Sequence, residues 1–186
     1  RTARELGYVI PDNSGIGTTE KYEGAVVLEA NPGAYFDVVS ALDFASLYPS
    51  IIRAHNMCYS TMIRGDARPP GVKTFGVDTS FGHVEFAQGT KGVVPTLLEQ
   101  LAQYRKDAKR AMAEARARGD TWAEGLYNGR QLAYKVVMNS VYGFLGATKG
   151  IFPCVPIAAA VTTTGRHMLG TVQDLVRQIV PGTKVV

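Results

Sequence analysis

The sequence contains only two cysteines, Cys58 and Cys154, in 186 residues. Two thiols are too few for a disulfide framework or for a zinc site of their own, and unpaired cysteines are typical of a reducing, intracellular compartment. A long apolar run is also missing, because the stretch from Cys154 to Val161 is far shorter than the ~20 residues that cross a bilayer. We therefore expect an intracellular protein that does not span a membrane.

The N-terminus has neither an initiator methionine nor the apolar core of a signal peptide. We expect the chain to be an internal piece of a longer protein. Hydrophobic residues make up 46% of it, which is enough to bury a core and excludes intrinsic disorder. The length fits one domain or parts of two.

Net charge is low, at +4, but the basic residues are concentrated in one segment. Residues 105–118 carry six basic side chains against two acidic ones, Asp107 and Glu114. A cluster of this kind is compatible with binding to a polyanion or a phosphate group, although a solvated charged helix face is the commoner explanation.

Hydrophobic periodicity predicts three long helices. The first begins at Pro95 and ends at Arg118–Asp120, and the second follows almost at once, with Thr121 and Glu124 as a capping box, and runs to about Tyr142. Helices joined by so short a turn pack as an antiparallel hairpin. A third helix is expected from about Ile157 to Ile179.

The rest of the chain is expected to be strands, loops and one short helix. Tyr, Phe and Val predict a strand at Ala34–Leu42, and the short helix follows from Ser50 to about Asn56, with Pro49 in its first turn. Further strand material is expected in residues 1–33, around Phe81–Phe86, between residues 143 and 156, and from Thr183 onward.

One face of the second long helix carries functional side chains at spacings of four, four and three. Because a helix turns by about 100° per residue, these side chains share an arc of about 80°. They are Gln131, Lys135, Asn139 and Tyr142. On the first helix, Arg105 and Lys109 lie one turn apart, and if the hairpin turns both faces the same way, three cations converge. Three converging cations are the kind of site that binds a triphosphate.

Asp43 is the strongest candidate acid, because it follows a predicted strand and faces a turn, where α/β proteins often place metal ligands. A helix cap or a simple turn acid is the commoner role of such a residue. Phosphatase-type aspartyl chemistry would need a second Asp two residues on, where this chain has Ala45. No spacing of histidines suggests a metal site, and no serine has a neighbouring base that would support acyl transfer.

Three segments resemble family B DNA polymerases. Asp43–Ile52 is similar to motif A, Lys135–Gly143 to motif B (Lys-x-x-x-Asn-Ser-x-Tyr-Gly), and Arg105–Lys109 to the basic helix of the fingers. The likeness extends over almost the whole chain, from about Gly7 to Val186, and leans towards delta-type enzymes and those of large DNA viruses. It implies DNA-templated transfer of a dNTP to a primer 3′-hydroxyl in DNA replication, with two Mg²⁺ ions.

The resemblance assigns a role to each matching residue. Asp43 and the Phe44 carbonyl would bind metal, Tyr48 would lie under the sugar and exclude a 2′-hydroxyl, and Asn139 would support the triphosphate contacts. The remaining expected contacts are to the triphosphate (Arg105, Lys109, Lys135 and the backbone of Ser46 and Leu47) and to the nascent base pair (Tyr142 and Gly143).

The implied fold is α+β, with a palm sheet and packed helices interrupted by an antiparallel two-helix fingers insertion. Residues 1–93 would be the N-terminal part of the palm, 94–143 the fingers hairpin, and 144–186 the C-terminal part of the palm. The family's other carboxylates lie in Tyr-Gly-Asp-Thr-Asp, which this chain lacks, so we expect the isolated chain to be nearly inactive.

The implied partners are primer–template DNA and dNTP, with a processivity factor as a further candidate and a nucleus or a viral replication site as the location. The alternative function is a non-catalytic nucleic-acid-binding module derived from a polymerase. A purely structural domain is the third reading, but it does not explain why two long functional patterns occur together.

Overall fold

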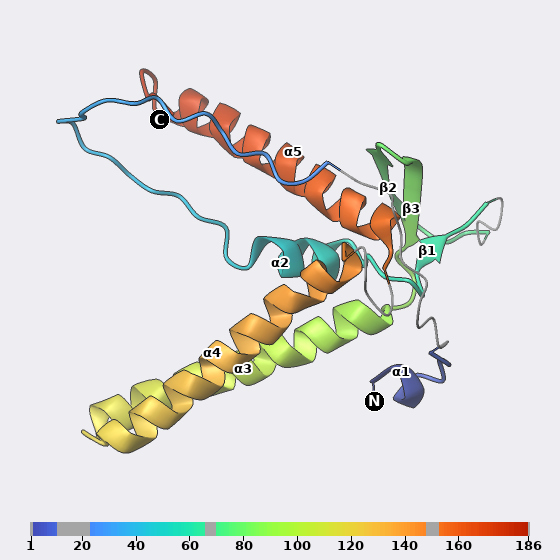
Figure 1. The fold of residues 1–186 in the computed structure, drawn as a ribbon, viewed down its shortest axis with the longest axis horizontal. Coiled ribbons are helices and arrows are strands. Elements are labelled where there is room, and N and C mark those ends of the chain that lie inside the picture. Colours follow the sequence, from blue (N-terminus) through green and yellow to red (C-terminus); the bar gives the residue numbers. More distant parts are fainter. Residues whose placement is uncertain (1, 11–22, 66–69, 148–152, 186) are drawn as a thin grey trace.

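The computed structural model describes residues 2–10, 23–65, 70–147 and 153–185, and Figure 1 shows their arrangement. A small three-stranded antiparallel sheet is combined with long packed helices, so the expected α+β class is confirmed. Along the chain the elements are α1 (Thr2–Glu5), α2 (Leu47–Ala54), β1 (Met62–Ile63), β2 (Thr74–Thr79), β3 (Gly82–Ala87), α3 (Val93–Ala117), α4 (Thr121–Leu145) and α5 (Val155–Ile179).

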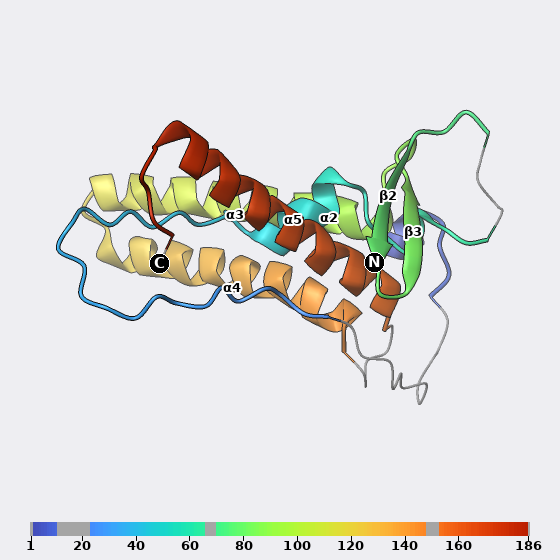
Figure 2. The ribbon, with the colours of Figure 1, turned by 90° about the horizontal axis from the view of Figure 1, so that it is seen from above.

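The predicted helical hairpin is confirmed: α3 and α4, with 25 residues each, lie side by side and project from the rest of the molecule (Figures 1 and 2). The turn between them contains Gly119 at φ 71°. The capping-box interpretation is wrong by one residue, because the Asp120 side chain accepts the hydrogen bond of the Ala123 N–H. Glu124 instead pairs with Arg116 across the hairpin at 2.6 Å.

The ends of the other helices also differ slightly from the predictions. α4 continues three residues past Tyr142, and α5 begins at Val155 rather than Ile157. α2 begins at Leu47, three residues before the expected start at Ser50, so Pro49 is the third helical residue. Proline is tolerated there because first-turn N–H groups have no partner within the helix.

The core lies where the base of the hairpin meets α2, α5 and the sheet. β3 is the central strand of the order β1-β3-β2, and its Phe86 is fully buried. Its location agrees with the strand expected around Phe81–Phe86. The same core cluster contains side chains from α2, α3, α4 and α5, namely Ile51, Ile52, Leu98, Met138, Leu145, Ile157 and Val161.

Residues 34–42 do not form the predicted strand. They are exposed extended coil within a long excursion that runs from Glu23 along α5 and back to α2 (Figures 1 and 2). Arg166 forms an ion pair with Glu23 at 3.0 Å at the start of the excursion, and further along it the Asn31 side chain donates to the Val185 carbonyl. A strand requires a neighbouring strand, and none of the described segments pairs with this one.

Other strand predictions are wrong in the described parts. Residues 2–10, 23–33 and 183–185 contain no strand, and α1 occupies part of the first of these segments. Residues 143–145 are helical, whereas 11–22, 148–152 and 186 lie outside the described residues. Within the described ranges, no helix is long and apolar enough to span a bilayer.

Asn56 joins α2, the sheet and the start of α3. It is buried and has a left-handed backbone (φ 51°). Its Nδ2 donates to the Ala87 and Thr90 carbonyls at 2.7 and 2.8 Å, and its Oδ1 accepts from the Gly92 N–H at 2.8 Å. One side chain therefore fixes the base of the hairpin relative to the sheet.

We expect Asn56→Asp to loosen this base, because a carboxylate can accept from Gly92 but cannot donate to the two carbonyls. Amide hydrogen exchange at Gly92 and in the first turn of α3 should accelerate by about tenfold or more, since each buried group left unpaired costs about 1–3 kcal/mol. Asn31→Asp, at an exposed site, is the control. Equal protection in both variants would contradict the assigned role of Asn56.

Candidate nucleotide site

The turn into α2 holds five of the predicted residues. Ser46 is the N-cap in a left-handed conformation (φ 52°, ψ 54°), and its side chain makes no capping hydrogen bond. Asp43 is exposed three residues before it, on coil rather than at the end of a core strand. Since Ser46 is the cap, the alternative role of Asp43 as the cap is also wrong. Of the other three predicted residues, Phe44 precedes the cap, and Leu47 and Tyr48 are the first two residues of α2.

Tyr48 and Tyr142 bring the two motif segments together. Their ring centroids are 4.2 Å apart with an interplanar angle of 35°, and both residues are half-buried. The two side chains come from α2 and from the last turn of α4, which are 94 residues apart in sequence. The first turn of α2 therefore lies at the Tyr142 end of the predicted α4 face.

The α4 face is anchored at both ends and open between them. Gln131 is buried, and its Oε1 accepts from Arg105 Nε of α3 at 3.3 Å. Tyr142 is held at the other end by Tyr48. Lys135 and Asn139, one and two turns beyond Gln131, are exposed. The face thus offers an ammonium and an amide between two fixed contacts.

The predicted cations are brought together only in part. Arg105 lies against the α4 face through its bond to Gln131, whereas Lys109 and Lys135 are exposed. Neither lysine has a hydrogen bond or ion pair to any residue in the described ranges. Their convergence with Arg105 on one anion stays a prediction. Gly143 is exposed in α4, with nothing within 4 Å of the position of a Cβ.

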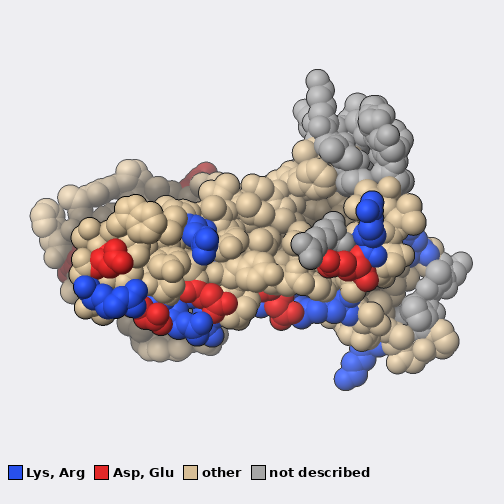
Figure 3. All heavy atoms as spheres, turned by 90° about the horizontal axis from the view of Figure 1, so that it is seen from below, with Lys and Arg blue, Asp and Glu red and all other residues tan. Residues whose placement is uncertain are grey.

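Much of the remaining basic segment is neutralised by acids. Arg110 pairs with Asp107 at 3.2 Å, and Arg116 pairs with Glu124 across the hairpin. Figure 3 shows acidic and basic side chains next to one another on the face that it views. The interpretation as a solvated charged face therefore fits these two arginines.

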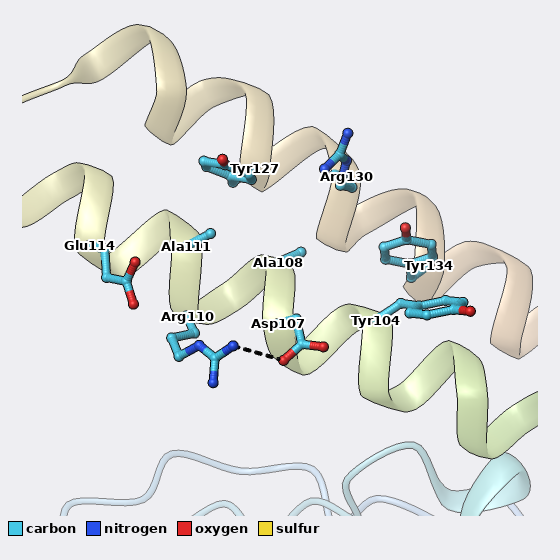
Figure 4. Close-up of a pocket in the computed structure, with 9 residues that line it drawn as sticks. All are labelled: Tyr104, Asp107, Ala108, Arg110, Ala111, Glu114, Tyr127, Arg130 and Tyr134. Atoms are coloured by element: carbon cyan, nitrogen blue, oxygen red, sulfur yellow. Dashed lines mark hydrogen bonds and ion pairs between the residues drawn. The ribbon is translucent and has the colours of Figure 1, made fainter.

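An open groove of about 670 Å³ lies between α3 and α4 (Figure 4). Its α4 residues, Tyr127, Arg130 and Tyr134, are offset from the stripe of Lys135 and Asn139, so the groove is a separate surface. Two arginines and two acids line it, which gives no net attraction for a polyanion. Its complete lining is Tyr104, Asp107, Ala108, Arg110, Ala111, Glu114, Tyr127, Arg130 and Tyr134.

The described residues do not form a complete metal centre. No group of three or more His, Cys, Asp or Glu side chains in these ranges could hold an ion. Asp43 alone supplies one carboxylate, whereas Mg²⁺ prefers an octahedral shell of six oxygen ligands. The described residues therefore offer one candidate ligand side chain for the expected ions and not the site as a whole.

Comparisons with known proteins agree with these observations. The family model described as DNA polymerase family B matches residues 1–184. A DNA polymerase of Paramecium bursaria Chlorella virus NY2A is 49% identical over 99% of the chain, and the DNA polymerase delta catalytic subunit of Dictyostelium discoideum is 41% identical over 96%. The solved family B DNA polymerase of Pyrobaculum calidifontis superposes over 96% of the chain with a TM-score of 0.75 and 29% identity. The chain spans between 16% and 23% of the length of these proteins.

Proposed function

The chain belongs to DNA polymerase family B, and we propose that it is the nucleotide-binding part of a DNA-directed DNA polymerase. In the proposed reaction the primer 3′-oxygen attacks the α-phosphorus of a dNTP, and the bond to pyrophosphate breaks. The observation that carries the proposal is the Tyr48–Tyr142 contact, because it joins the start of α2, four residues after Asp43, to the helix that carries Lys135 and Asn139.

In this proposal the α3–α4 hairpin is the fingers. Its observed bounds, Val93 and Leu145, lie within two residues of the predicted range of 94–143. Residues 1–93 and 144–186 belong to the palm, and the three-stranded sheet is part of it. The relatives include a viral enzyme and delta subunits, and the higher identity to the viral one, 49% against 41%, supports the viral leaning of the sequence.

The nucleotide would lie along the open part of the α4 face. Lys135 and Asn139 are exposed there, and Arg105 reaches the same face through Gln131, so charged and amide groups can donate to phosphate oxygens. The N–H groups at the start of α2, at Ser46 and Leu47, are free of a side-chain cap and can bind a phosphate oxygen. Lys109 would add charge, while Tyr142 and Gly143 would face the base pair.

Magnesium enters this proposal only through Asp43 and the Phe44 carbonyl. Both are oxygen donors on the same short segment, and the exposed carboxylate is open to a cation. When bound, the ions would neutralise charge on the transferring phosphate. The remaining carboxylates must come from outside the described residues, so we propose no activity for the isolated chain.

The alternative is a non-catalytic module that only grips nucleic acid. The two functions are separated by primer extension with the full-length parent protein, because only a polymerase adds the templated nucleotide. For a pure binder we expect no extension and a steep loss of DNA affinity with salt. Template-directed extension would exclude this alternative, and its absence in an intact, folded parent would contradict the proposed function.

Tyr48→Ala in the full-length parent should relax selection against ribonucleotides. The ring would contact the sugar, and removing it leaves room for a 2′-hydroxyl, so we expect the ratio of kcat/KM for dNTP over rNTP to fall about 100-fold. Tyr59→Ala, a half-buried tyrosine outside the face, is the matched control. An unchanged ratio would remove Tyr48 from sugar selection.

A further inference from the structure

α5 contains two glycines, and only Gly165 lies close to α2. A Cβ built at Gly165 would lie 3.4 Å from Tyr48 Cε1, 3.6 Å from Ile51 Cδ1 and 3.7 Å from Leu47 Cδ2. These three residues lie on one side of α2, and Gly165 itself is buried. There is room for a methyl group at this position but not for a larger side chain.

The backbone does not require glycine at this position. Gly165 has no positive φ and lies inside a regular helix, where glycine is a poor helix former. Gly170, five residues later in the same helix, has nothing within 4 Å of its Cβ position. What distinguishes the two glycines is therefore the neighbour, the Tyr48 ring.

The Tyr48 ring is thus held by two helices. Tyr142 of α4 contacts it with centroids 4.2 Å apart, and Gly165 of α5 lies against the Cε1 edge. α4 belongs to the projecting hairpin, whereas α5 packs on the sheet side of the core. The ring therefore has one contact on the hairpin and a second contact, through α5, on the sheet side of the core.

We propose that Gly165 is a positioning residue for sugar selection, because it fixes the edge of the Tyr48 ring against α5. This inference rests on the proposed function, and it adds a specificity determinant outside the two motif segments. Gly165 touches no substrate and acts through Tyr48.

The test is a size series at residue 165 in the full-length parent, with the same series at residue 170. Gly165→Ala fits at ordinary contact distance and should leave the dNTP over rNTP ratio unchanged. Gly165→Val displaces the ring from its seat, and the ratio should fall about tenfold, which is the effect of a changed apolar contact in a specificity pocket. Gly170→Ala and Gly170→Val make the same changes in helix propensity with no neighbour nearby.

A ratio is used because it does not depend on the folded fraction. Both nucleotides are used by the same active molecules, so a loss of stability in Gly165→Val cancels in the ratio. An unchanged ratio in Gly165→Val, or an equal change in Gly170→Val, would overturn the inference.

A double variant tests whether the effect passes through the ring. In a Tyr48→Ala background, Gly165→Val should have no further effect on the ratio, since the group that it displaces is absent. An equal effect in both backgrounds would overturn the inference. Its failure is distinct from that of the proposed function, because the latter is contradicted only if the intact parent does not extend a primer.

Discussion

Asp43→Asn in the full-length parent should lower kcat for primer extension by about a thousandfold. The uncharged amide is a weaker metal ligand than the carboxylate, and a bound metal contributes several kcal/mol to stabilising the transition state. Affinity for primer–template should change little, since Asp43 is one exposed acid at the turn before α2. Single-turnover extension with saturating dNTP measures the chemical step, and a filter-binding titration measures the DNA affinity.

Asp37→Asn is the matched control for this variant. Asp37 is also exposed and lies on the same coil, six residues before Asp43. We expect wild-type extension from it. If both variants lost activity equally, the effect would come from the charge of the coil, and Asp43 would not be a metal ligand.

The second large effect is expected from Lys135→Ala. Removal of a charged donor from the triphosphate should lower kcat/KM for dNTP by about 100-fold, since a hydrogen bond to a charged group is worth about 1.5–3 kcal/mol. Primer–template affinity should stay within about twofold, with an unchanged salt slope, because no contact to a DNA phosphate is lost and the same number of counterions is released on binding. Nucleotide titrations measure kcat/KM, and primer–template binding titrations at two salt concentrations measure the DNA affinity and its salt slope.

Lys106→Ala is the control for the loss of a positive charge. Lys106 is exposed on α3 but is offset by about 100° from Arg105, so it does not share the face that reaches α4. Parallel losses of nucleotide use and DNA affinity in Lys135→Ala would contradict a triphosphate contact and favour general phosphate binding.

The helical hairpin could be predicted because its signals are local. Apolar residues at helical spacing mark α3, and Gly119 and Asp120 end one helix and start the next within three residues. The error at the cap is small, since both Asp120 and Thr121 are good capping residues and only the backbone decides between them. The resemblance to the polymerase motifs is equally local, and the family match confirms it.

That residues 34–42 form no strand could not be predicted from those residues alone. Tyr, Phe and Val favour a strand only where a neighbouring strand completes the hydrogen bonds, and propensity does not report whether one is present. The contact between Tyr48 and Tyr142 could not be predicted either, because residue spacing within α2 or α4 does not show which helices pack together. The sequence around Gly165 does not predict its role either, because that role depends on its contact with the Tyr48 side chain, 117 residues away.

The length of the hairpin has a mechanical consequence. A 25-residue helix is about 37 Å long, so the two helices form a lever whose fulcrum is the junction fixed by Asn56. Lys135 lies ten residues from the end of α4, or about 15 Å along this arm. A swing of about 10° would carry Lys135 through about 2.6 Å, enough to make or break a hydrogen bond, and the tip through about 6 Å. Tyr142 lies close to the fulcrum and would hardly travel. If Lys135 binds a phosphate as proposed, such a lever would move its charge relative to that phosphate while the ring pair at its base stays in contact.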